Sequence, residues 1–125
     1  MDIPPIVNQN IGFNMNKLKV TDIDRFKYTV KRNIKIDHAI ICAGGGGLTA
    51  GSCMALKHIN PNCHVYTAEP DEWNDHQQSF AKNERVALDT NRTGLCDGLL
   101  TPTPGEIPFQ INQHFGVTGL SASDQ

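Results

Sequence analysis

The sequence predicts an α/β fold, with a short parallel sheet and flanking helices. Residues 36–43 have a continuously apolar centre, which is typical of a strand buried on both faces of a parallel sheet. Four glycines follow, and residues 48–58 then have a helical pattern that Asn60-Pro61 ends. A second apolar strand is expected over 63–68. Strand, glycine turn, helix and strand together make one βαβ unit.

Weaker patterns complete the domain. The elements expected downstream are a helix over 73–82, a polar loop over 83–96, a rigid proline loop over 101–105, a short helix over 106–114 and a last strand over 116–120. A short amphipathic helix is expected over 21–32. Residues 1–16 are expected to be extended, because Pro4 and Pro5 exclude a helix interior there. We expect residues 1–35 to be a lead-in segment and residues 36–125 to form the domain.

Composition limits the partners. The 125 residues suffice for one domain, with 38% hydrophobic and 19% charged residues. A net charge of -2 gives no basic surface for nucleic acid. No apolar run approaches the ~18 residues of a membrane span, and the N-terminus lacks the pattern of a signal peptide. We therefore expect no nucleic-acid or membrane partner and a cytoplasmic location.

The cysteines indicate neither zinc nor disulfides. Cys42, Cys53, Cys63 and Cys96 include no C-x-x-C pair. Cys42 and Cys63 lie in the two apolar strands, so both are expected to be buried, free thiols. Free thiols fit a reducing compartment.

The glycine run Gly44–Gly47 is the clearest functional signal. Glycines let an anion approach the main chain closely, and the following helix offers unpaired N–H groups and the positive end of its dipole. Thr49 and Ser52 could add hydroxyl donors. The run therefore predicts a phosphate-binding loop, and the alternative is a tight turn needed only for close packing of strand and helix.

A dinucleotide site is a second alternative. Residues 45–50 satisfy G-x-G-x-x-A, and Glu69 ends the next strand, where a ribose-binding acid would lie in a Rossmann unit. Against this, the run has one glycine too many, and the chain lacks room for a second mononucleotide-binding half.

Four stretches in order carry a family resemblance, which extends over residues 37–124: Ile40–Leu48, Tyr66–Pro70, Asp75–Phe80 and Asp97–Leu99. They resemble the threonine/serine dehydratases and serine racemases, pyridoxal-phosphate enzymes of fold type II with a tryptophan-synthase-β-like fold. The resemblance implies that the domain corresponds to the larger lobe of that fold. It also implies a parent activity, the removal of water from L-threonine or L-serine to give a 2-oxo acid and ammonia.

The resemblance assigns the site residues. It implies that Gly44, Gly45, Gly46 and Gly47 hold the phosphate of pyridoxal 5'-phosphate, and that Gly98 lies beside the cofactor ring. The substrate implied is a small amino acid.

In metal-dependent members of the family, the resemblance places a cation between two carboxylates and a carbonyl. The matching positions are Glu69, the carbonyl of Trp73, and Asp75. Such oxygen ligands suit Mg²⁺ or Ca²⁺. The alternative is that Asp71, Glu72 and Asp75 are simply the acidic first turn of a helix.

The family's catalytic lysine has no match. The family places it in a Ser-x-Lys motif upstream of the glycine loop, and no lysine here has a serine two places before it. Arg25-Phe26-Lys27 comes nearest but lacks the serine. His76 lies in the acid cluster and is expected at a solvated helix position, with a role as a metal ligand as the alternative, and no catalytic residue is assigned. The chain is therefore expected to be a fragment or remnant of such an enzyme, inactive alone and prone to self-association. A non-catalytic phosphate-binding or partner-binding domain is the alternative.

Overall fold

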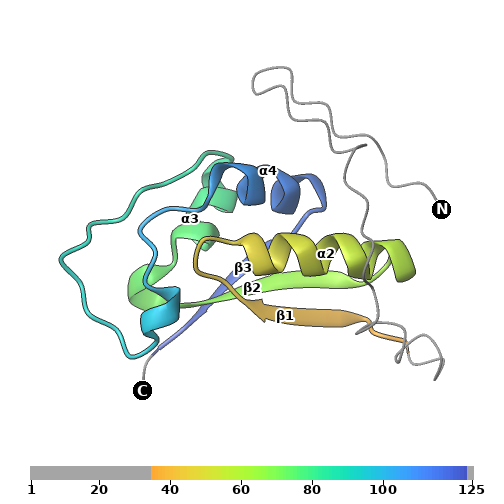
Figure 1. Ribbon diagram of the computed structural model, residues 1–125, viewed down its shortest axis with the longest axis horizontal. Helices are drawn as coiled ribbons and strands as arrows, with labels where there is room; N and C mark the ends of the chain where they lie inside the picture. The colour runs from red at the N-terminus through yellow and green to blue at the C-terminus, as the bar shows by residue number, and fades with distance from the viewer. Residues whose placement is uncertain (1–34, 124–125) are drawn as a thin grey trace.

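The computed structural model describes residues 35–123, and three parallel strands form its centre (Figure 1). In chain order the elements are β1 (His38–Cys42), α2 (Gly47–Ile59), β2 (His64–Pro70), the 3-10 turn η2 (Asp71–Trp73), α3 (Asp75–Lys82), the 3-10 turn η3 (Asp97–Leu99), α4 (Glu106–His114) and β3 (Thr118–Ala122). The strand order is β1-β2-β3, with both pairs parallel. The α/β class with a short parallel sheet is confirmed.

The expected helices are present. The helix predicted over 48–58 spans 47–59, and the helix predicted over 106–114 has those bounds. The helix predicted from residue 73 begins at Asp75, because η2 precedes it. The helix predicted over 21–32 lies outside the described residues. Within the described part, no helix has the length and apolarity needed to cross a membrane.

Helices cover one face of the sheet. Figure 1 shows α2 and α4 on the same side of the three strands. The buried core beneath them consists of Cys53, Leu56, Cys63, Val65 and Val117, and a second cluster of Ala50, Met54 and Ile111 lies between α2 and α4. The burial of Cys63 as a free thiol is confirmed.

The opposite face is open within the described residues. Ile40 is 66% exposed, and Leu120 is 38% exposed. Cys42 is also exposed, so its predicted burial is wrong. The apolar run of β1 suggested burial on both faces, but β1 is an edge strand of the described sheet and alternates between exposed and half-buried residues.

A glycine lets α3 approach the sheet. A Cβ atom added at Gly119 in β3 would overlap the Cα of Gln77 and lie 2.8 Å from its Cβ. Only glycine therefore permits this contact between α3 and β3. The contact fixes the position of the first turn of α3, which borders the candidate site.

Candidate functional site: the glycine turn

The candidate phosphate loop lies where β1 meets α2. Ala43 still pairs with β2, donating from its N to the Ala68 carbonyl at 3.0 Å, and the chain then turns through the glycines. Gly46 has φ 87°, in the left-handed region that glycine occupies without strain. The turn lies at the carboxyl end of a parallel strand, where open α/β sheets bind ligands.

The carbonyls of the three turn glycines, Gly44–Gly46, are each held by a different donor. The ring Nε2 of His76 donates to the Gly44 carbonyl at 2.9 Å. The N–H of Gly105 donates to the Gly45 carbonyl at 2.9 Å. The N–H of Ala50 donates to the Gly46 carbonyl at 2.9 Å, as the first bond of α2. Donors from α3, α2 and the start of α4 thus orient the turn.

These anchors leave three amides available. Peptide bonds here are trans, so each N–H points away from the carbonyl of its own peptide unit. The N–H groups of Gly45, Gly46 and Gly47 therefore each point away from the donor that holds the carbonyl of the same peptide unit. Among residues 35–123, none of the three donates a hydrogen bond. Successive free amides at a helix N-terminus attract an anion.

Space around the turn separates its glycines into two kinds. A Cβ added at Gly45 or Gly47 would meet no atom within 4 Å. A Cβ at Gly44 would lie 2.8 Å from Thr101 Oγ1 and 3.0 Å from the Gly98 carbonyl oxygen. The structure therefore brings Gly98 beside the turn. Gly45 and Gly47 border open space from which a ligand can approach.

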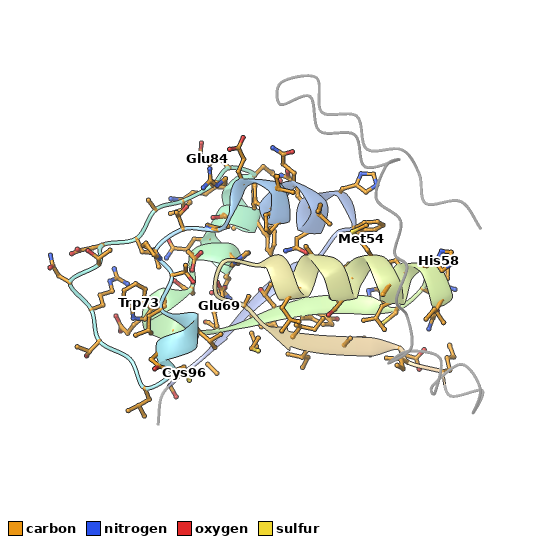
Figure 2. The ribbon with its side chains drawn as sticks, in the orientation of Figure 1. Met54, His58, Glu69, Trp73, Glu84 and Cys96 are labelled. Carbon is orange, nitrogen blue, oxygen red and sulfur yellow. The ribbon has the colours of Figure 1, made fainter. Side chains whose placement is uncertain are left out.

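Glu69 lies close to the turn and caps α3 (Figure 2). It is 3% exposed. Its Oε1 accepts from the N–H of His76 at 2.8 Å, and its Oε2 accepts from the N–H of Gln77 at 2.9 Å. A carboxylate there satisfies two unpaired amides of the helix and complements its dipole.

A second carboxyl group lies beside it. Asp75 is fully buried, and neither of its oxygens has a hydrogen-bond partner within the described residues. Ligand atoms of Glu69, Asp75 and His76 lie within 4.8 Å of one another. Trp73, the third predicted ligand, is buried at the end of η2. The structure thus brings Glu69 and Asp75 together.

Burial makes the charged forms of both acids costly. It raises the pKa of Glu69 to about 7. Burial, with the nearby Glu69 charge, raises the pKa of Asp75 to about 8. Such a pair keeps a proton near neutral pH unless a cation neutralises it. Asp71 and Glu72 are exposed in the 3-10 turn η2, whereas Asp75 lies in the first turn of α3 and is buried. The acidic-first-turn alternative therefore fits the position of Asp75 but does not explain its burial.

The predicted solvated position of His76 is wrong. Its side chain is fully buried, with its ring 5.8 Å from that of Phe80. Burial lowers the pKa of His76. Since Nε2 donates to a carbonyl, the neutral ring carries its proton there. The spacing of His76 and Phe80, four residues apart on one helix face, is the sequence signal that could have indicated burial.

The remaining predicted donors differ in burial. Thr49 is fully buried, and its Oγ1 has no partner within the described residues. Ser52 is half-buried in the first turns of α2. Neither hydroxyl contacts the glycine carbonyls, which are held by the donors described above.

Comparison with known proteins decides the family. A family model for pyridoxal-phosphate dependent enzymes matches residues 26–125. This chain belongs to that family. The match begins inside the segment 1–35. Family membership favours pyridoxal phosphate over the dinucleotide alternative, and the capping role of Glu69 already occupies the acid that a ribose would need.

Similar proteins narrow the relationship. The chain is 42% identical over 90 residues to a serine racemase of Schizosaccharomyces pombe, covering 72% of this chain and 28% of that protein. It is 36% identical over 91 residues to an L-threo-3-hydroxyaspartate ammonia-lyase of Saccharomyces cerevisiae, and this match covers 73% of this chain and 28% of that protein. The processed form of threonine deaminase isoform 2 from Solanum lycopersicum superposes with a TM-score of 0.68 and 29% identity, and the superposition covers 77% of this chain and 28% of that structure. The chain thus spans about 28% of the length of these relatives. The resemblance to fold-type-II enzymes is confirmed.

Proposed function

We propose that this chain carries the cofactor-phosphate loop of a pyridoxal-phosphate-dependent ammonia-lyase that removes water from L-threonine or L-serine. Three adjacent glycine amides carry the proposal, because each points away from the anchored carbonyl of its own peptide unit and none donates a hydrogen bond within residues 35–123. The relatives include an ammonia-lyase and a threonine deaminase, which supports the reaction class.

In this proposal the chain binds and orients, and the cofactor supplies the electron sink. The amides of Gly45, Gly46 and Gly47 bind the phosphate dianion. The turn at Gly98 borders the ring, since its carbonyl lies against Gly44. The chain has no Ser-x-Lys motif to hold the cofactor covalently. Residues 36–125 then act as a partial cofactor-binding domain that does not turn over substrate alone.

A binding experiment tests the phosphate site. Pyridoxal phosphate, pyridoxal and NADH are titrated against the full chain and followed by calorimetry. We expect binding of pyridoxal phosphate, about tenfold weaker binding of pyridoxal, as is typical when charge-assisted hydrogen bonds are lost, and none of NADH. Borohydride treatment should leave no specific lysine adduct. Equal affinity for pyridoxal phosphate and pyridoxal would contradict the site, and 2-oxobutanoate formed from threonine would contradict the inactivity.

We also propose a divalent cation, Mg²⁺ or Ca²⁺, at Glu69, Asp75 and the carbonyl of Trp73. The burial of the adjacent Glu69 and Asp75 carboxyl groups supports it, since their ionised forms need a compensating charge there. Trp73 is the single tryptophan, so its fluorescence reports on the site. Asp75→Asn should abolish a Mg²⁺- or Ca²⁺-induced change that the exposed-site control Asp71→Asn retains. No response in the wild type would contradict the cation site.

The remaining assignments complete the proposal. We place the protein in the cytoplasm, because Cys42, Cys53, Cys63 and Cys96 are all free thiols. A net charge of -2 supports a small-molecule partner and disfavours nucleic acid or an anionic membrane surface. The open apolar sheet face supports self-association.

A further inference from the structure

His76 joins two parts of the site. Its main-chain N–H donates to Glu69 Oε1 at 2.8 Å, while its ring Nε2 donates to the Gly44 carbonyl at 2.9 Å. The other close anchors of the glycine carbonyls, from Ala50 and Gly105, come from main-chain N–H groups. A second side chain, Asn112, donates from Nδ2 to the Gly46 carbonyl at the longer distance of 3.4 Å. His76 is therefore the shorter of these two side-chain anchors and the one that holds the Gly44 carbonyl.

The bond from His76 acts on a donor of the proposed phosphate site. The Gly44 carbonyl and the Gly45 N–H belong to one planar peptide unit. A hydrogen bond to the carbonyl fixes that plane and polarises the unit, which makes the N–H a stronger donor. The anion would meet this N–H on the side opposite the histidine.

The ring also supports the next glycine. A Cβ added at Gly46 would overlap the Cε1 of His76 and lie 2.9 Å from its Nε2. The ring therefore lies directly against the backbone of the turn, and Gly46 is held at φ 87° above it. The position of His76 is in turn fixed by its full burial and by the hydrogen bond from its main-chain N–H to Glu69.

We propose that His76 is a positioning residue for the phosphate site, which sets the direction and donor strength of the Gly45 N–H toward the cofactor's phosphate. This inference rests on the proposed phosphate site and adds the residue that orients it. His76 itself lies on the carbonyl side of the peptide and does not contact the phosphate.

The test compares two ligands that differ only in phosphate. Pyridoxine 5'-phosphate and pyridoxine carry an alcohol in place of the aldehyde, so neither links to lysines. Calorimetry on the full chain gives the ratio of their affinities. We expect this ratio to fall about fivefold to tenfold in His76→Leu, the range that loss of one polarising hydrogen bond permits. His76→Gln, which keeps an N–H donor, should restore it, and the exposed control His114→Leu should not change it.

Each outcome decides the proposal. If His76→Leu does not fold by circular dichroism, His76→Asn replaces it, because its side chain is polar but too short to keep the bond. If the ratio is unchanged in a folded variant, even where both affinities fall, the positioning role is overturned and the phosphate site stands. A wild-type protein that does not prefer the phosphorylated ligand would overturn the site and the role together.

Discussion

The two faces of the sheet invert the usual distribution of polarity. The helix-covered side buries Glu69, Asp75 and His76, all less than 4% exposed. The open face carries Ile40 and Leu120 in exposed positions. Burying an ionisable group costs free energy. Such groups are therefore found together mainly at functional sites. The comparison therefore places the chemistry on the covered side and indicates a contact surface on the open side.

The two faces also differ in how closely their residues are held by neighbouring elements. On the covered side, each turn carbonyl has a donor, and α3 touches the backbone of β3. On the open face, a change of side chain meets no helix within the described residues. Substitutions should therefore be costly on one side and mild on the other.

The largest effect of a substitution is expected at Gly119. In Gly119→Leu the new side chain would overlap Gln77 and push α3 off the sheet. Overpacking of this kind should lower the free energy of unfolding by about 3 kcal/mol. Urea unfolding followed by circular dichroism measures it.

Gly51→Ala in α2 is the matched control, because a Cβ at Gly51 meets no atom within 4 Å. Alanine is the better helix former, so this variant should be stabilised by up to about 1 kcal/mol. If Gly119→Leu were as stable as the wild type, the close contact of α3 and β3 would be wrong.

The buried carboxyl pair predicts a pH dependence. The folded protein holds the protons of Glu69 and Asp75 more tightly than the unfolded chain, whose pKa values are near 4.5 and 3.8. Stability should therefore fall as the pH rises from about 4.5 through the folded pKa values of about 7 and about 8. In EDTA, the loss between pH 5 and pH 8 from the two groups together should be on the order of 5 kcal/mol.

Asp75→Asn removes one of the two titrations and should flatten this profile. Mg²⁺ added at pH 8 should restore stability to the wild type, because a cation favours the ionised pair. A wild-type profile that rises between pH 5 and pH 8 would show that the carboxyl groups are not held in their protonated forms.

A smaller effect separates binding from stability at Gly45. A Cβ there enters open space on the proposed ligand side. Gly45→Ala should therefore change the free energy of unfolding by no more than about 0.5 kcal/mol. Its affinity for pyridoxal phosphate should fall about tenfold, because the methyl group blocks close approach to the amides. Normal affinity in Gly45→Ala would place the phosphate elsewhere.

The sequence predicted the order of the helices and strands better than it predicted which of their residues are buried. The glycine run between an apolar strand and a helix predicted the turn, and the resemblance brought in Gly98, which lies beside Gly44. The burial of His76 was missed because α3 as a whole is polar, and its contact with the turn depends on the distant Gly119. The exposure of Cys42 was missed because an apolar run does not show which face a helix covers.

The open face offers the mildest change and the sharpest test of its role. Ile40 in β1 pairs with Tyr66 in β2, which pairs with Thr118 in β3, and Leu120 lies on the same face. Ile40→Thr with Leu120→Thr places β-branched, strand-favouring residues at both positions and removes exposed apolar surface. The free energy of unfolding should change by no more than about 1 kcal/mol, while the average mass measured by light scattering should fall toward that of a monomer. A large loss of stability would instead show that another part of this chain already covers the face, and an unchanged mass would place the self-association elsewhere.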